Sequence, residues 1–485
     1  MINLFSLLSV SIAAAQDTVA QIAESVETAV DSTATTLVEQ AATTDISQLP
    51  AWTMIPFILM LLMIAIGPLI AEHWWEDNYN KLIVSILLGV PTAVYLMSAY
   101  GMQGVHALEH QVIYDYIPFI VLLLSLYVIT GGIHLSGDIK AKPIINTAFL
   151  GIGWILASIM GTTGAAMLLI RPLITTNQQR KHTVHTILFF IALVANCGGL
   201  LTPLGDPPLF MLFLRGASFT WFSSMWLPWL FTGVILLIIY YIWDTIMYKK
   251  EDWTALSADA REQVPLHLGG SINFLYLLGV VLSVAFINEG TIPAMKDPDA
   301  PLWLQFLREI VLISLTILSL RTTKDKVRYE LNKFTWAPII EVAFLFLGIF
   351  TTMTPALIYL NGHAASFGFD QPWQFYYTTG MLSSFLDNTP TAVAFHSVAT
   401  GVDFSTTTLA ASSFVAGVPE VILKAICIGA VFFGAMTYIG NGPNFMVKAI
   451  AEENNIKMPS FFGYMIKFSL IVLLPVYILV QLIFL

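Results

Sequence analysis

The amino-acid sequence predicts an all-α polytopic membrane protein built from two inverted-topology repeats. Three observations lead to this fold class: an apolar composition, apolar stretches of membrane-spanning length that recur along the chain, and an internal repeat centred on interrupted helices. Of the 485 residues, 57% are apolar and 11% are charged, whereas an ordinary soluble domain is roughly 25% charged. The lipid bilayer is therefore the expected environment.

Membrane segments are identified by length, because a helix needs roughly 20 apolar residues to cross a hydrocarbon core of about 30 Å. This criterion predicts about 10–13 transmembrane segments or part-segments. No linker rich in Pro, Gly or Ser divides residues 51–485, which we interpret as one membrane domain. The candidate spans are 53–71, 82–100, 116–133, 144–160, 184–196, 225–247, 271–289, 302–320, 336–353, 421–439 and 463–485.

Loop charges predict the orientation of these segments. The loop 321–335 holds the densest run of Lys and Arg, which places it in the cytoplasm. The loop 290–301 has one lysine and two aspartates and is placed outside. Counting back through the spans puts the loops that contain Lys140 and Arg180 in the cytoplasm and the N-terminus outside.

The first 50 residues differ in composition from the rest. Residues 1–15 form a candidate secretory signal, because an apolar run is followed by Ala13, Ala14 and Ala15, although the usual positive start is missing. The alternative is an uncleaved amphipathic tail. Residues 16–50 carry six acids and no base, which predicts an acidic extracytoplasmic tail.

An internal repeat relates one segment, about residues 116–247, to a second segment, about residues 336–485. In the predicted topology the span at Pro118 runs inward and the span at Pro338 runs outward, so the two copies are inverted. Three pairs of segments match in order: 117–130 on 337–350, Ser158–Ala166 on Ser384–Ala392, and Asn196–Gly199 with Gly205–Pro208 on Gly440–Asn444. Inverted repeats with Gly- and Pro-interrupted segments at matching positions are typical of secondary transporters, whose sites form near the bilayer midplane.

The second repeat carries the strongest candidate site, Asp387 with Asn388, Thr389 and Thr391 in an otherwise apolar stretch. A carboxylate in the middle of a membrane costs about 2.5 to 3.5 kcal/mol on insertion scales, so it calls for a partner or a function. Carboxylate, amide and hydroxyl oxygens suit a small hard cation such as sodium. The alternative is that Asp387 and Asn388 only cap a short helix.

The first repeat offers a second acid, Asp206, in a segment rich in Pro and Gly that Asn196 precedes. Its repeat partners are Asn441 and Asn444. The same pattern also fits a surface loop in which Asp206 is the N-cap of a helix over Pro207–Leu214, since Pro is favoured at the first helical position.

Two further residues are weaker candidates for proton coupling. Glu341 lies five residues inside its predicted span, and its repeat counterpart is Val121, so packing does not require an acid there. It could instead reach the cytoplasmic interface. His396, nine residues after Asp387, fits a proton relay, but a membrane histidine often only satisfies a helix contact.

Several classes of function are not supported by the sequence. Cys197 and Cys427 are the two cysteines, too few for a disulfide framework or a four-cysteine zinc site. The net charge of −10 argues against a nucleic-acid surface. No phosphate-binding loop, zinc-spaced histidine pair or nucleophile motif is present, so we expect no enzyme and no cofactor beyond transported ions.

The segments Asn196–Asp206 and Ser384–Thr391 resemble the NhaD-type sodium/proton antiporters of the ion transporter superfamily, which also includes citrate and dicarboxylate carriers. The resemblance covers roughly residues 50–485, and the sequence is also similar to proteins grouped as citrate transporters. It implies re-entrant hairpins and discontinuous helices in each repeat, a homodimer, an elevator-like movement of the transport domain and a location in the bacterial inner membrane.

One departure from that family matters. Antiporters of this type usually repeat an Asp-Asn motif in the first hairpin, where this chain has Gly161, Thr162, Thr163 and Gly164. A site in the first half would then depend on Thr162, Thr163, backbone carbonyls and Asp206.

Two transport functions fit these residues. The first is sodium (or lithium)/proton antiport, in which sodium binds at Asp387, Asn388 and Asp206 and competes there with protons. The second is sodium-coupled symport of citrate or another carboxylate, held at the hairpin tips by amides and hydroxyls. A channel or a non-transporting scaffold is a third class, which the inverted repeat disfavours.

Overall fold

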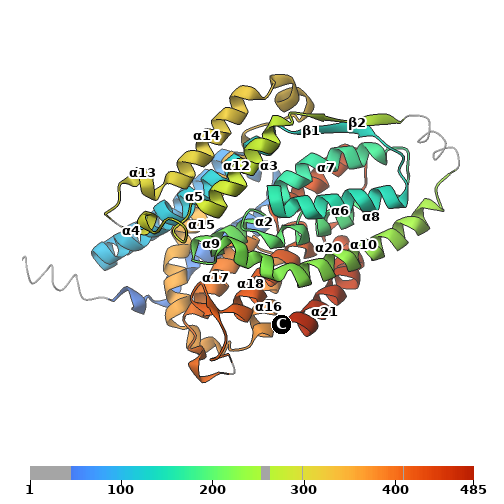
Figure 1. Cartoon of the computed structure of the whole chain (residues 1–485). Coiled ribbons are helices and arrows are strands. Elements are labelled where there is room, and N and C mark those ends of the chain that lie inside the picture. The colour runs from blue at the N-terminus through green and yellow to red at the C-terminus, as the bar shows by residue number, and fades with distance from the viewer. Residues whose placement is uncertain (1–44, 253–262, 298, 408) are drawn as a thin grey trace, which may run out of the picture.

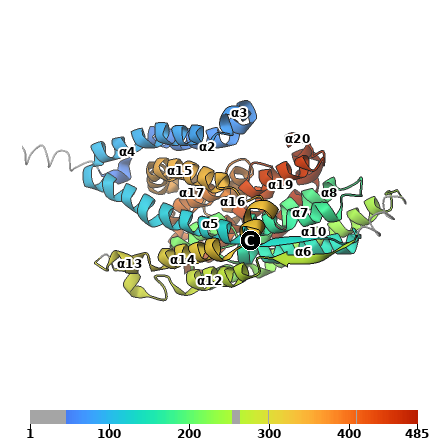
Figure 2. The same ribbon diagram turned by 90° about the horizontal axis from the view of Figure 1, so that it is seen from above.

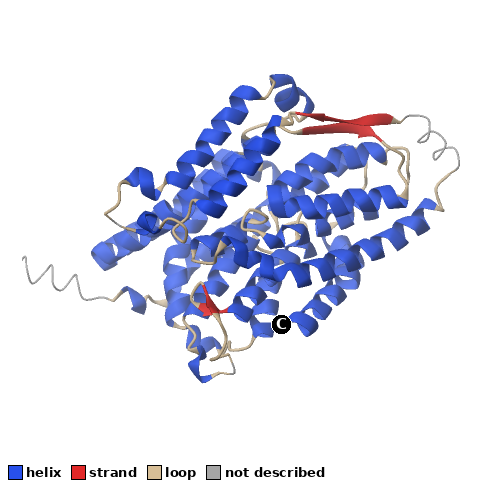
Figure 3. Ribbon diagram, viewed as in Figure 1, coloured by secondary structure: helices blue, strands red, loops and turns tan. Residues whose placement is uncertain are grey.

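The computed structural model describes residues 45–252, 263–297, 299–407 and 409–485. Within these ranges most of the chain is helical and the strands are confined to two small hairpins (Figure 3). The predicted all-α class is therefore confirmed. The candidate signal at 1–15 and the acidic tail up to residue 44 lie outside the described residues.

The helices fall into an N-terminal group, a first repeat, a connecting group and a second repeat (Figure 1). The first two groups are α2 (Ile55–Ile70), α3 (Glu72–Trp75), α4 (Asn78–Glu109), α5 (Ile117–Thr130), α6 (Pro143–Met160), α7 (Thr162–Thr176), α8 (Val184–Leu193), α9 (Pro207–Leu214) and α10 (Trp226–Tyr248). The others are α12 (Ile272–Phe286), α13 (Leu302–Gln305), α14 (Leu307–Thr322), α15 (Ala337–Gly362), α16 (Pro372–Ser383), α17 (Asn388–Thr400), α18 (Glu420–Phe433), α19 (Gly442–Glu453), α20 (Phe461–Tyr464) and α21 (Leu474–Phe484).

Seven helical segments of the described ranges are long and apolar enough to cross a membrane, which makes the chain a multi-pass membrane protein. They are Ala51–Pro68, Asn78–Thr130, Pro143–Met160, Val184–Leu201, Phe219–Tyr248, Ala337–Gly362 and Phe461–Phe484. Short helices such as α9, α16 and α17 account for much of the remaining apolar chain. At 1.5 Å per residue, the twelve residues of α16 reach only about 18 Å.

The predicted spans 82–100 and 116–133 lie on either side of a break at Gly101, whose φ of 54° and ψ of −129° divide α4 into two helices. After this break the chain stays helical through the π-helical turn His110–Tyr116 and on to Thr130. The first span therefore ends where the sequence predicted, whereas the second helix begins well before residue 116.

The two repeats have the same order of elements. Each starts with a long helix, α5 or α15, and continues with a helical hairpin, a helix interrupted at its centre and a final long helix. Two hydrogen bonds show that the first helices run in opposite directions: Tyr127 Oη, near the end of α5, donates to Thr335 O, whereas Tyr116 Oη donates to Ala343 O. The repeats are therefore inverted, as the sequence predicted.

Contacts between loops agree with the predicted sides of the membrane. Strand β1 (His134–Asp138), in the loop with Lys140 that was placed in the cytoplasm, pairs antiparallel with β2 (Val264–Gly269) of the loop that follows α10. On the opposite side, Arg215 pairs with Asp115, and Tyr114 Oη donates to Gln305 Oε1. The second hairpin, β3 (Phe414–Val415) with β4 (Val418–Pro419), follows α17.

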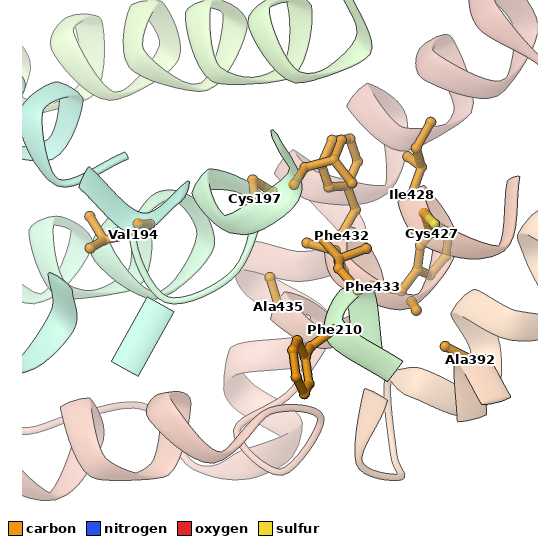
Figure 4. Close-up of a cluster of buried hydrophobic side chains, with 14 of the residues drawn as sticks. Val194, Cys197, Phe210, Ala392, Cys427, Ile428, Phe432, Phe433 and Ala435 are labelled. Carbon is orange, nitrogen blue, oxygen red and sulfur yellow. The ribbon is translucent and has the colours of Figure 1, made fainter. Parts of the chain in front are cut away.

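The repeats share one hydrophobic core. Seen from above, α2 and α4 lie along one edge and α12 to α14 along the opposite edge, with α15 and α17 between them (Figure 2). The close-up of the core in Figure 4 shows Cys197 and Phe210 of the first repeat near Phe432 and Phe433 of the second. Packing between the halves therefore surrounds the places where the interrupted helices break.

Candidate functional site

Each repeat contains a helical hairpin whose tip points to the centre of the molecule. In the first, α6 ends at Met160 and α7 begins at Thr162, with Gly161 between them at a φ of +80°, a conformation that favours glycine. In the second, α16 ends at Ser383 and α17 begins at Asn388, with Asp387 as its N-cap. The aligned residues Gly161 and Asp387 thus occupy the same position in the two tips.

Each repeat also contains a broken helix. Helix α8 passes through a 3-10 turn (Cys197–Leu201) to residues 202–206 and then α9, and α18 passes through Gly434–Met436 to residues 437–441 and then α19. The first break is tight, since a Cβ added to Gly205 would lie 1.9 Å from the carbonyl oxygen of Gly199. Only a glycine fits there.

Matching hydrogen bonds join each hairpin tip to the broken helix of its own repeat. The Thr202 hydroxyl donates to Ser158 O, and the Thr437 hydroxyl donates to Ser384 O. The sequence analysis had aligned Ser158 with Ser384 but assigned neither serine nor threonine a role. The structure shows that these four residues set the position of both tips in the same way.

Asp206 lies where the two repeats meet, and its side chain is 1% exposed. Its Oδ1 accepts from Thr162 Oγ1 at 2.9 Å and from Asn441 Nδ2 at 3.2 Å. Its Oδ2 accepts from Asn388 Nδ2. The carboxylate therefore collects donors from both hairpin tips and from the second broken helix.

The alternative interpretation placed Asp206 in a surface loop, as the N-cap of a helix over Pro207–Leu214. Asp206 is the N-cap residue of α9, which begins at Pro207, but it is buried and its carboxylate makes no capping hydrogen bond. A capping side chain bonds to the N–H of the second or third helical residue, and the second residue here, Pro208, has no N–H. The carboxylate faces the second repeat instead.

Asp387 does cap its helix, because its Oδ1 accepts from Thr389 N at 2.9 Å. The Thr391 hydroxyl donates to the backbone oxygen of Asp387. Asp387 and Asp206 lie close enough to interact electrostatically. Two buried acceptors at this tip, Asn388 Oδ1 and Thr389 Oγ1, have no partner within the described chain, so these oxygens could complete a cation site.

The predicted residues Asn196 and Asn444 are brought together between the two broken helices. Asn196 Nδ2 donates to Asn444 Oδ1 at 2.7 Å, and Asn441 Nδ2 donates to Asn196 Oδ1 at 3.1 Å. Asn444 Nδ2 donates to the backbone oxygens of Gly434 and Thr437. This chain of hydrogen bonds joins the two broken helices, and each of the two amide oxygens accepts one hydrogen bond.

Three other predicted residues do not contact Asp206. Thr163 follows Thr162 in α7, and its side chain has no hydrogen bond to the described residues. Glu341 Oε1 lies 2.8 Å from Lys81 Nζ of α4, an ion pair that sequence reasoning missed. His396 Nε2 contacts Ala416 O at 2.8 Å, about two turns along α17 from the tip.

A buried charged network on the predicted cytoplasmic side was also missed. Arg180 Nη2 lies 2.6 Å from Asp244 Oδ1, which His185 Nε2 also contacts at 2.9 Å. Asn146 Nδ2 donates to the other oxygen of Asp244. This network attaches α6 and α8 to α10, so it supports the first repeat without reaching the central site.

Two similarities to known proteins bear on this geometry. A family profile described as "Putative citrate transport" matches residues 46–485. The chain is also 30% identical over 121 residues to the inner membrane protein YbiR of Escherichia coli (strain K12), a match that covers 22% of this chain and 32% of that protein. The chain thus spans about a third of the length of this curated relative. Neither match names an NhaD-type antiporter.

The family match covers both repeats and every residue of the central cluster. It agrees with the citrate transporters that the sequence analysis named beside the antiporters. The protein belongs to the family described as "Putative citrate transport".

Proposed function

We propose that the protein is a cation-coupled secondary transporter in which sodium (or lithium) and protons compete for one site around Asp206 and Asp387. The observation that carries this proposal is the charge of the site. Among the described residues, Asp206 and Asp387 contact amide, hydroxyl and backbone donors, and no lysine, arginine or histidine pairs with either carboxylate.

A carboxylate inside the membrane requires compensation of its charge. Neutral donors at Asp206 stabilise its negative charge only in part. A proton or a metal ion is therefore needed to balance the charge of the two acids, Asp206 and Asp387. The unpartnered Asn388 Oδ1 and Thr389 Oγ1 provide further oxygen ligands. The same oxygens cannot hold both ions, and this competition gives sodium/proton antiport as the favoured function.

Sodium-coupled transport of citrate or a related carboxylate is the second candidate. The family match favours it, and so do the N-terminal ends of α7 and α17 at the hairpin tips, since helix N-termini attract anions. Sodium bound at Asp387 would then offset the negative charge of the two acids, so that an anion could bind beside them. The name of the relative supports an inner-membrane location as a further proposal. The resemblance noted in the sequence supports that location and a homodimer.

Transport in proteoliposomes separates the two candidates. For the antiporter, sodium or lithium added to acid-loaded vesicles collapses the pH gradient without any organic anion, because a tenfold gradient supplies about 1.4 kcal/mol per proton. For the carboxylate symporter, radiolabelled citrate accumulates only with sodium, and sodium alone moves no protons. The second result across pH 6 to 9 would replace the antiporter by the symporter.

A further inference from the structure

The loop 321–335, between α14 and α15, carries exposed cations without acidic partners. Its exposed basic residues are Arg321, Lys324, Lys326 and Lys333. Within the described residues, the ion pairs of lysine are those of Lys81, Lys181, Lys424 and Lys448. None of these lies in the loop, and the arginine ion pairs of the same described ranges do not include Arg321. The exposed acids of the loop are Asp325 and Glu330, so four cations against two acids leave a net charge of +2. An anionic partner therefore suits this loop.

The buried side chain of Arg328 holds the loop in place. It is 1% exposed, and its guanidinium donates to Val128 O near the end of α5 and to the backbone and side-chain oxygens of Ser319 in α14. Asn332 Nδ2 donates to Gly131 O at 2.8 Å. The loop is thus attached to the ends of two helices, beside strands β1 and β2 (Figure 1). A loop that only sets the orientation needs positive charge but no fixed shape.

Two exposed aromatic rings lie in the same loop region as these cations. Phe334 is buried, and its ring centroid lies 6.0 Å from that of Tyr329 and 5.3 Å from that of Trp336. Tyr329 and Trp336 are 46% and 40% exposed. Trp336 directly precedes α15, which is long and apolar enough to cross the membrane. Because Trp and Tyr combine an apolar ring with a polar edge, they settle at the headgroup level of a bilayer.

We propose that this loop binds anionic phospholipids of the adjacent leaflet. Lys324, Lys326 and Lys333 contact the lipid phosphates, while Tyr329 and Trp336 lie at the headgroup level. Several basic residues next to a membrane helix are typical of binding to anionic lipid, and lysine provides a compact charge for phosphate. The inference concerns the lipid partner and does not depend on which ion drives transport.

Electron paramagnetic resonance of spin-labelled lipids tests this selectivity, with the full chain reconstituted in phosphatidylcholine vesicles. Spin-labelled phosphatidylglycerol is expected to associate with the protein at least about fivefold more strongly than spin-labelled phosphatidylcholine, the effect of one lysine near an anionic lipid. The triple variant K324Q/K326Q/K333Q should lose most of this preference. The control K142Q/K249Q/K250Q removes the same charge from exposed positions of other loops, and it should keep the preference.

Fluorescence quenching tests where the lipid binds. Brominated phosphatidylglycerol should quench the emission of Trp336, measured as the difference between the parent protein and Trp336→Phe, more than brominated phosphatidylcholine does. The triple variant K324Q/K326Q/K333Q should remove this difference between the lipids. Salt at 1 M, where the Debye length is about 3 Å, should also reduce it.

Three results would overturn the inference. One is equal association of both spin-labelled lipids with the parent protein. Another is the same loss of preference in the control variant, which would mean that general surface charge attracts the lipid. The third is displacement of phosphatidylglycerol by free inorganic phosphate at an equal concentration, which would assign the loop to a soluble anion. Thermal unfolding of each variant verifies that it is folded.

Discussion

The side-chain amide of Asn388 donates to the carboxylate of Asp206, although the two residues are 182 positions apart and belong to opposite repeats. This contact joins the tip of one hairpin to the broken helix of the other repeat. Any ion that binds Asp206 must therefore change the hydrogen bonding of a hairpin tip. In the proposed function, this contact would couple ion binding at Asp206 to the position of the hairpin tip.

Replacing Asp387 by Asn should abolish cation-driven proton movement while leaving the fold intact. Asparagine is as good an N-cap as aspartate, so α17 keeps its start, but the titratable charge is lost. We expect the exchange rate in proteoliposomes to fall by more than about tenfold, or roughly 1.4 kcal/mol. Asp370→Asn, at an exposed position before α16, should transport at the normal rate. Normal exchange by Asp387→Asn would mean that Asp387 is only a cap.

Removing the Asp206 side chain should destabilise the protein as well as stop transport. Asp206→Ala leaves the Thr162 hydroxyl and the Asn388 amide without their acceptor, and each buried polar group without a partner costs about 1–3 kcal/mol. A clearly lower unfolding temperature in detergent is expected, whereas the exposed-site control Asp325→Ala should unfold like the parent. An unchanged unfolding temperature for Asp206→Ala would show that these donors find other partners.

The matched threonines should respond alike to substitution. Thr202→Val and Thr437→Val each remove the donor to a serine carbonyl, and each should reduce the free energy of unfolding by about 1–3 kcal/mol. The Ser variants retain the hydroxyl and should be close to the parent. Thr220→Val, at an exposed position, is the control. A large effect of one Val variant without an effect of the other would contradict the equivalence of the two tips.

Cysteine labelling can test the orientation directly, since Cys197 and Cys427 are both buried. Lys296→Cys and Lys324→Cys introduce thiols at exposed positions on opposite sides of the predicted membrane. In intact cells an impermeant reagent should label residue 296 and not residue 324. Labelling of residue 324 alone would mean that the predicted orientation is reversed. Labelling of both residues would mean that they lie on the same side, so that the chain does not cross the membrane an odd number of times between them.

The fold could be predicted because its signals are local. Apolar length marks membrane helices, and Gly161, Gly205 and the neighbouring prolines mark the breaks, since few other residues fit such backbone positions. The repeat could be aligned because the same interruptions recur in the same order. The end of the first span at residue 100 was predicted, since a break follows at Gly101, but the helix after that break begins earlier than the predicted residue 116.

The partners within the site could not be predicted, because they come from distant parts of the chain. Asp206 meets Thr162 from 44 positions away and Asn441 from 235 positions away. Glu341 was considered for proton coupling because it lies inside a predicted span. Its partner Lys81, on a helix outside the repeat, could not be identified from the sequence. Asn196 and Asn444 were expected to be ligands, and their hydrogen bonds to each other and to Asn441 depend on geometry that residue types do not encode.

A cavity of about 650 Å³, lined by Arg215, His396 and Lys296 among other residues, has an electrical consequence for the proposed transport. It is large enough to hold water, and the eight residues of α9 put about 12 Å between it and Asp206. Water in this cavity would carry the potential of one side of the membrane inward, so a cation that moves between the cavity and Asp206 would cross part of the membrane voltage within the length of α9. Each 100 mV that falls there would contribute about 2.3 kcal/mol per unit charge.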